Sequence, residues 1–133
     1  KEFGLQCQKL GIPIFLVTGG FLETAQRVVK EVGFQDFCAN QFLYKDNQVT
    51  GQLGNPIVDT DFKRSWLVQK CQSLGISSGT VVSVGDSAND RSMFQESRIA
   101  IGFDPQETVL RDLHLVNFSG SHQVLSYFLV SKS

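Results

Sequence analysis

The chain has 133 residues, of which 41% are hydrophobic and 19% charged, the composition of an ordinary soluble globular protein with one core. Its net charge of −1 excludes a basic field that would attract nucleic acid, so an anion would need a local binding site. No apolar run approaches the roughly 20 residues of a membrane-spanning helix, and no signal segment opens the sequence. We therefore expect a cytoplasmic protein without membrane or nucleic-acid partners.

The first third of the chain predicts a helix end, a strand and a second helix. Residues 1–11 have the pattern of the end of a helix, and residues 12–17 form an apolar run typical of a strand buried on both faces. Residues 21–32 have apolar side chains at helical spacing, and Gly33 is a suitable C-terminal cap. The turn Thr18-Gly19-Gly20 joins this strand to its helix.

The remaining elements continue the alternation. Residues 41–53 indicate a partly exposed β-hairpin that turns at Asp46-Asn47. Residues 61–74 predict a helix capped by Thr60 or Asp61 and ended by Gly75. Beyond it we expect strands at 81–84, 99–101 and 113–116, and helices at 88–96, after Asp104-Pro105 and at 121–130.

This order of elements predicts an α/β fold, with a mostly parallel sheet covered by helices on both faces and a small β-hairpin beside it. We expect a single domain over residues 1–133. Cys7, Cys38 and Cys71 are an odd, irregularly spaced set, which predicts buried thiols in a reducing compartment rather than disulfides or a zinc site. Ligands in such folds bind beyond the carboxyl ends of the strands, so candidate site residues are sought there.

The first candidate is Thr18-Gly19-Gly20, directly after a predicted strand. A hydroxyl beside glycine amides at a helix start can bind an anion, because glycine lets the ligand approach closely and the helix dipole favours negative charge. The alternative is a tight turn that merely needs glycine. The second candidate is Lys63, in the first turn of a helix, where a cation opposes the helix dipole. It is either a solvated lysine or a cation held over a phosphate.

The third candidate is the acidic segment from Gly85 to Asp90, directly after another predicted strand. Asp86 and Asp90 are four residues apart, so they fall on the same side of the following helix, with Asn89 between them. Carboxylate and amide oxygens are hard ligands of the kind that Mg²⁺ takes, one or two at a time. The alternative is that both aspartates only stabilise the start of a helix.

Together the three candidates resemble the motifs of the haloacid dehalogenase superfamily of phosphohydrolases: a hydroxyl at a strand end (Thr18), a lysine (Lys63) and a Gly-Asp-x-x-Asn-Asp loop (residues 85–90). Further segments narrow the resemblance to phosphoserine phosphatase, namely Val17-Thr18-Gly19-Gly20-Phe21, Cys38-Ala39-Asn40 and Gly54-Asn55-Pro56-Ile57-Val58-Asp59. The resemblance implies a three-layer, Rossmann-like HAD fold and Mg²⁺-dependent hydrolysis of a small phosphate monoester such as phosphoserine, in serine biosynthesis.

The resemblance also implies roles for the candidate residues. Thr18 and Gly19 would bind the phosphoryl oxygens, with the Gly20 amide near, and Lys63 would neutralise charge on the phosphoryl group. Asp86 would hold Mg²⁺ with support from Asp90. Asn89 would hydrogen-bond the phosphate or orient the loop.

The family's nucleophile is an aspartate of an Asp-x-Asp motif, and no such motif precedes Thr18 in these residues. Asp59-Thr60-Asp61 has the letters but follows no buried strand and lies beside Lys63, so we reject it as the nucleophile. By resemblance, the first, central strand and the helical cap that follows it are also missing. We therefore expect the chain to be inactive by itself and to expose two sheet edges.

Three explanations remain for this gap. The chain is a piece of a longer enzyme, a shortened relative without phosphatase activity, or a protein that fills the missing strand from another chain, such as a second copy of itself. The functional alternative is a non-catalytic module that binds phosphate and Mg²⁺ or a partner. The upstream sequence discriminates, because an Asp-x-Asp motif there would favour the enzyme.

Overall fold

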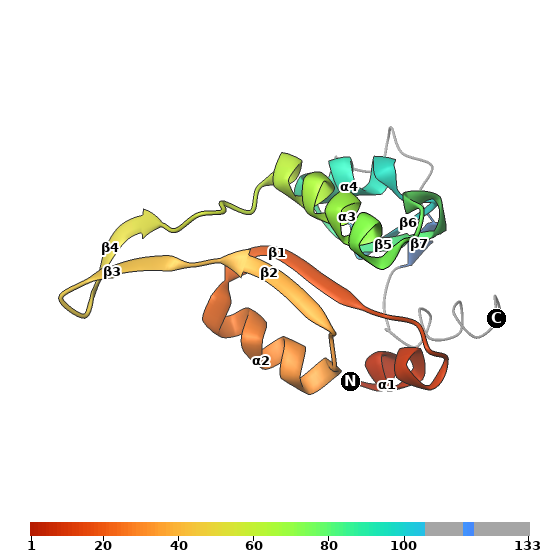
Figure 1. The fold of residues 1–133 in the computed structure, drawn as a ribbon, viewed down its shortest axis with the longest axis horizontal. Helices are drawn as coiled ribbons and strands as arrows, with labels where there is room; N and C mark the ends of the chain where they lie inside the picture. The colour runs from red at the N-terminus through yellow and green to blue at the C-terminus, as the bar shows by residue number, and fades with distance from the viewer. Residues whose placement is uncertain (106–115, 119–133) are drawn as a thin grey trace. The chain divides into compact units, whose positions relative to one another are not determined.

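The computed structural model describes residues 1–105 and 116–118. The elements in chain order are α1 (Glu2–Lys9), β1 (Phe15–Phe21), α2 (Leu22–Val32), β2 (Asp36–Asn40), β3 (Phe42–Lys45), β4 (Gln48–Leu53), α3 (Thr60–Leu74), the 3-10 helix η1 (Ser78–Thr80), β5 (Val82–Gly85), the 3-10 helix η2 (Ala88–Asp90), α4 (Arg91–Glu96), β6 (Ile99–Phe103) and β7 (Val116–Phe118) (Figure 1). The helices expected after Asp104-Pro105 and at 121–130, and the start of the strand expected at 113–116, lie outside the described residues.

The chain divides into two compact units, Lys1–Val58 and Asp59–Ser133. In the first unit β1 and β2 pair in parallel, with Thr18 opposite Ala39 and an irregular register between Thr18 and Phe21. The predicted turn Thr18-Gly19-Gly20 is therefore the irregular end of β1, which starts later and runs further than residues 12–17. Strand β2 was not predicted, because its apolar run, Phe37-Cys38-Ala39, is short and lies between the polar residues Asp36 and Asn40.

Helix α2 follows β1 directly and ends as predicted. It starts at Leu22, and Gly33 takes the left-handed conformation at its end with φ of 86°, which glycine adopts without steric cost. The expected helix end at residues 1–11 is α1. Cys7, Ile14 and Ala25 are buried in this unit and form part of its core.

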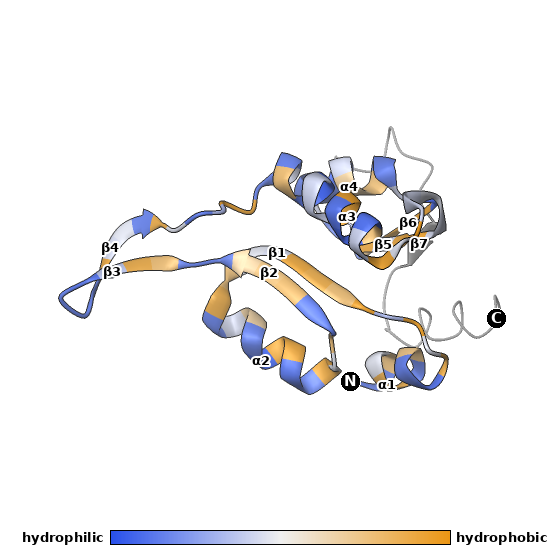
Figure 2. Ribbon diagram, viewed as in Figure 1, coloured by the Kyte–Doolittle hydropathy of each residue, from blue (hydrophilic) through white to orange (hydrophobic). Residues whose placement is uncertain are grey.

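The predicted hairpin is confirmed as β3 and β4, which pair antiparallel. Asp46 and Asn47 take positive φ values of 51° and 61° at its turn, the conformation that a two-residue hairpin connection requires. The turn is hydrophilic in Figure 2, and Tyr44 and Val49 are exposed on the strands. The hairpin is thus the exposed element that its polarity predicted.

In the second unit β5, β6 and β7 form a parallel sheet in that order. Helix α3 packs on α4, and α4 lies against β5 and β6. The buried apolar residues in the described part of this unit include Leu67, Cys71, Met93, Phe94 and Ile101. The predicted 88–96 helix is in fact two short helices, η2 and α4.

The ends of α3 are partly as predicted. Gly75 ends the helix in the left-handed conformation with φ of 65°. Its N-terminal cap is Asp59, which accepts a hydrogen bond from the Phe62 N–H at 2.8 Å, and not Thr60 or Asp61. A cap must have extended backbone one residue before the helix, and the helix begins at Thr60.

Strand β5 is not buried on both faces by the described residues. Val82 and Val84 are 38% and 40% exposed, whereas Ser83, between them, is 4% exposed. Side chains alternate across a strand, and the Ser83 hydroxyl shares a hydrogen bond with Ser97 at the end of α4. Ser83 therefore lies on the face of β5 that packs against α4, and Val82 and Val84 lie on the opposite face.

These elements confirm an α/β fold with parallel strands, although the described strands form separate two- and three-stranded parallel sheets. Among the described residues, β1 pairs with β2 and β5 pairs with β6. Cys7 and Cys71 are buried, Cys38 is half-buried, and none of the three forms a disulfide. No helix among the described residues is both long and apolar enough to pass through a membrane.

Candidate phosphate and metal site

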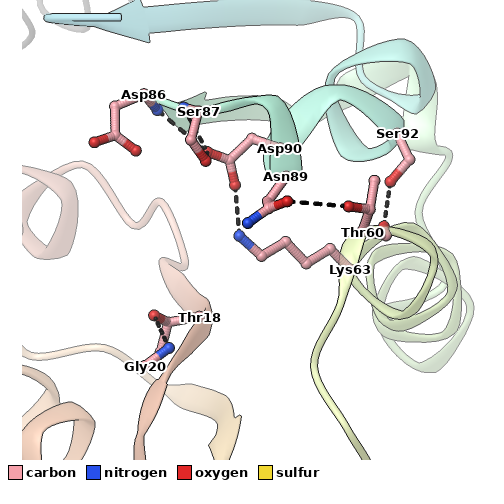
Figure 3. Close-up of polar contacts among 9 residues, drawn as sticks. All are labelled: Thr18, Gly20, Thr60, Lys63, Asp86, Ser87, Asn89, Asp90 and Ser92. Carbon is pink, nitrogen blue, oxygen red and sulfur yellow. Dashed lines mark hydrogen bonds and ion pairs between the residues drawn. The ribbon is translucent and has the colours of Figure 1, made fainter. Parts of the chain in front are cut away.

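The end of β1 presents a hydroxyl and two exposed glycines. The Gly20 N–H donates a hydrogen bond of 3.0 Å to Thr18 Oγ1, which closes a small turn (Figure 3). A hydroxyl that accepts one hydrogen bond can still donate its own proton, so the Thr18 O–H can bind an anion oxygen. The backbone N–H groups at the start of α2, after Phe21, have no side-chain cap.

Lys63 lies in the first turn of α3 and is only 7% exposed. Its Nζ is 2.6 Å from Asp90 Oδ1, and Asp90 is 6% exposed. Figure 3 shows the lysine side chain reaching from α3 to this carboxylate. The alternative of a solvated lysine is therefore wrong, because the Lys63 side chain is buried. A buried ammonium group requires a partner, and Asp90 is that partner.

Asp90 uses its second carboxylate oxygen to close the acidic loop. Oδ2 accepts hydrogen bonds from the N–H groups of Asp86 and Ser87, both at 3.2 Å, and from the Ser87 hydroxyl at 3.3 Å. Ser87 and Asp90 form a capping box at the start of η2. The loop is thus fixed to α3 through one carboxylate, whose charge Lys63 balances.

A second set of contacts joins the same loop to the start of α3. The Thr60 hydroxyl donates to Asn89 Oδ1 at 3.4 Å, and the Ser92 hydroxyl donates to the Thr60 carbonyl (Figure 3). With its oxygen engaged by Thr60, the Asn89 side chain has its Nδ2 group left as a donor. Sequence patterns did not single out Thr60 or Ser92 as site residues, since hydroxyl residues are common at helix starts.

The loop fits Mg²⁺ through one direct carboxylate. Asp86 is exposed, and its side chain forms no hydrogen bond or ion pair with the described residues. Both oxygens of Asp90 are engaged, so Asp90 supports the loop. Within residues 1–105 and 116–118, no three His, Cys, Asp or Glu side chains gather closely enough to hold a metal ion. One carboxylate suits an ion that keeps most of its waters.

The predicted site residues fall into two sets. Thr18, Gly19 and Gly20 belong to the first unit, and Lys63, Asp86, Asn89 and Asp90 to the second. Within the second unit the structure joins α3 to the acidic loop, as the hydrogen bonds of Lys63 and Thr60 show. The catalytic and binding roles of all seven residues stay predictions.

Gly85 leaves the space that Asp90 occupies. A Cβ on residue 85 would lie 2.6 Å from Asp90 Cγ and 2.8 Å from Asp90 Cβ, well inside van der Waals contact. Gly85→Ala is therefore expected to lower the free energy of unfolding by about 1–3 kcal/mol, the usual cost of overpacking. The measurement is unfolding in urea.

Gly79→Ala is the matched control in the same unit. Its added Cβ would meet Ser77 Oγ at 3.4 Å, an ordinary contact, so its stability should stay close to that of the parent chain. Equal stabilities of the two variants would contradict the close approach of Asp90 to Gly85.

Comparison with known proteins agrees with these motifs. A family model described as haloacid dehalogenase-like hydrolase matches residues 1–95. The phosphoserine phosphatase of Archaeoglobus fulgidus is 31% identical over 113 residues, which are 85% of this chain and 33% of that protein. The phosphoserine phosphatase of Albidiferax ferrireducens is 30% identical over 112 residues, 81% of this chain and 47% of that protein. The chain thus spans between a third and a half of these curated relatives.

The fold has close counterparts among solved structures. A crystal structure of phosphoserine phosphatase in apo form superposes on this chain with a TM-score of 0.85 at 24% sequence identity. The superposition covers 95% of this chain and 64% of the phosphatase chain. A probable phosphoserine phosphatase from Vibrio cholerae gives a TM-score of 0.83 at 21% identity, with 98% and 42% covered. The predicted resemblance and HAD-like fold are confirmed, and the chain belongs to the haloacid dehalogenase-like hydrolase family.

Proposed function

We propose that this chain is the phosphate- and magnesium-binding part of a phosphoserine phosphatase-like hydrolase, which acts on small phosphate monoesters such as phosphoserine. The observation that carries the proposal is the buried ion pair between Lys63 and Asp90. Burial of two charges is costly, and here it fixes a cation beside an acidic loop whose remaining carboxylate, Asp86, is exposed. The phosphoserine phosphatases among its relatives support the proposed substrate class.

The chain's own residues would bind and neutralise the phosphoryl group. The Thr18 hydroxyl would donate to a phosphoryl oxygen, and Gly19 and Gly20 would allow the close approach of the ligand. Lys63 would compensate negative charge on the phosphoryl oxygens, and the Nδ2 group of Asn89 would donate a further hydrogen bond. The hydrogen bonds from Lys63 to Asp90 and from Thr60 to Asn89 would hold the Lys63 and Asn89 side chains in place before phosphate binds.

Asp86 would hold Mg²⁺ through its exposed carboxylate, with Asp90 in support. When bound, the ion supplies positive charge that stabilises the phosphoryl oxygens. By the same resemblance we propose a cytoplasmic location and a place in serine biosynthesis.

These residues would bind the phosphoryl group and would take no part in covalent chemistry. No Asp-x-Asp motif precedes Thr18 in the 133 residues, and Asp59 of the Asp59-Thr60-Asp61 segment is engaged as the cap of α3. The contacts of Lys63 and Asp90 would serve equally in a second candidate function, a non-catalytic module that binds phosphate and Mg²⁺.

Calorimetric titration with inorganic phosphate, with and without Mg²⁺, tests the proposal. We expect Mg²⁺ to strengthen phosphate binding, and Asp86→Asn to remove that effect, a loss of about tenfold in affinity or 1.4 kcal/mol. Asp61→Asn is the control, since Asp61 is exposed in the first turn of α3 and should leave the Mg²⁺ effect unchanged. Phosphate binding that is indifferent to Mg²⁺, or an equal loss in both variants, would count against Asp86 as the ligand.

A further inference from the structure

We propose that Asn40 is a positioning residue, which holds the Gly19–Gly20 peptide in the orientation that presents the Thr18 hydroxyl to phosphate. The proposal rests on the function proposed above for the end of β1. It concerns a residue that touches the turn rather than the ligand.

Asn40 holds the carbonyl end of one peptide unit. The Asn40 side chain is buried at the end of β2, with 6% of the residue exposed, and its Nδ2 donates to the Gly19 carbonyl at 2.8 Å. The N–H of the same peptide unit is that of Gly20, which donates to Thr18 Oγ1 at 3.0 Å. If the peptide rotated, both hydrogen bonds would break, and the Thr18 hydroxyl would lose the donor that orients its own proton outward.

The other end of the Asn40 amide is fixed as well. Oδ1 accepts from the Val58 N–H at 2.7 Å, and Val58 is itself buried. The Val58 carbonyl oxygen lies 3.4 Å from the position of a Cβ on Gly19, so the two backbones pass close together. Asn40 therefore ties the turn to the last residue of the first unit.

At neutral pH, the amide of asparagine satisfies both partners without charge. One end must donate to the Gly19 carbonyl and the other must accept from the Val58 N–H, which an aspartate carboxylate cannot do because it has acceptors only. A protonated aspartate, however, regains one donor. The side chain that Asn40→Asp introduces has nearly the same shape as the native one. Whether it can make both hydrogen bonds depends on whether it is protonated, and therefore on the pH.

The sign of the pH effect follows from this chemistry. At neutral pH the ionised carboxylate that Asn40→Asp introduces would face the Gly19 carbonyl oxygen. The two oxygens would repel one another, and the Gly19–Gly20 peptide would rotate away. As the pH falls through the pKa of that carboxyl group, which burial raises, the acid form donates to Gly19 again. Phosphate affinity of the variant relative to the parent chain should therefore rise as the pH falls.

The experiment is a phosphate titration of the parent chain and Asn40→Asp across the acidic and neutral range, compared at each pH. We expect the variant to bind about tenfold more weakly at neutral pH and to approach the parent in acid. Asn47→Asp is the control, because Asn47 is exposed at the hairpin turn with φ of 61°, which aspartate also adopts. An affinity ratio that stays at one, or that is lowered equally at every pH, overturns the proposal.

The Gly20 amide resonance, followed by NMR without phosphate, separates this proposal from the proposed function. In Asn40→Asp it should move with pH and return to its parent position in acid, whereas in the parent chain it should not. If the parent binds no phosphate, the proposed function fails, and the Gly20 resonance still tests whether Asn40 orients the turn. A folded variant whose Gly20 resonance does not move at neutral pH, or a variant that does not regain the parent resonance in acid, overturns the proposal.

Discussion

Replacement of Lys63 by methionine is expected to lower the free energy of unfolding by about 3–5 kcal/mol, as when one partner of a buried ion pair is removed. Asp90 would keep its buried charge without the ammonium group that now lies 2.6 Å away. The other oxygen of Asp90 accepts the hydrogen bond from the Asp86 N–H, so movement of the unpaired carboxylate would also disturb the loop that contains Asp86. Urea unfolding followed by circular dichroism measures the loss.

A double variant tests whether the loss comes from the unpaired charge. In Lys63→Met/Asp90→Asn the side chain at position 90 has no charge to bury, and its amide oxygen can still accept from the Ser87 N–H. We therefore expect the double variant to be more stable than Lys63→Met alone.

Arg64→Met is the control at the neighbouring position. Arg64 pairs with Glu96 at 3.0 Å, but the arginine side chain is 62% exposed and water screens the pair, so the loss of stability should be much smaller. An unchanged stability of Lys63→Met, or a double variant no more stable than the single one, would contradict the buried pair.

Phosphoserine hydrolysis by the 133-residue chain with Mg²⁺ is expected to stay at the background rate. The residues assigned here bind and neutralise a phosphoryl group, but none supplies the attacking aspartate that the family uses. Loss of a nucleophile costs roughly 10⁶-fold in kcat, so turnover would fall below detection even when the substrate binds. Release of inorganic phosphate from phosphoserine is the measurement.

Asp86→Ala is the control for this assay, because it removes the proposed magnesium ligand at an exposed position directly after β5. Any background release should be the same for this variant and the parent chain. Robust turnover by the parent that disappears in Asp86→Ala would show that these residues contain a nucleophile that sequence and structure both failed to reveal.

Elements controlled by local chemistry could be predicted from the sequence. Gly33 and Gly75 end their helices in the left-handed conformation, and Asp46-Asn47 forms the hairpin turn, because each depends on the backbone preference of one or two residues. Strand β2 escaped prediction because its pairing with β1 joins residues far apart in the sequence, such as Thr18 and Ala39, and its own residues have no clear alternation.

The candidate site shows the same division. The residue types of Thr18, Lys63 and Asp86 could be read from motifs, whereas the contact that buries Lys63 against Asp90 joins residues 27 positions apart. The proposed role of Asn40 depends on a carbonyl and an N–H group of two distant backbone segments, and no local pattern assigns that role to it. Such contacts follow from tertiary packing and not from local preference.

Thr18 and Gly19, and separately the loop from Asp86 to Asp90, are proposed to bind phosphate or Mg²⁺. Amide chemical shifts followed by NMR during titration with inorganic phosphate and Mg²⁺ test this proposal most directly, since they report each residue separately. We expect saturable shifts in both segments, with the hairpin turn at Asp46-Asn47 unmoved. Saturable shifts confined to other residues, or none in either segment, would contradict the proposal.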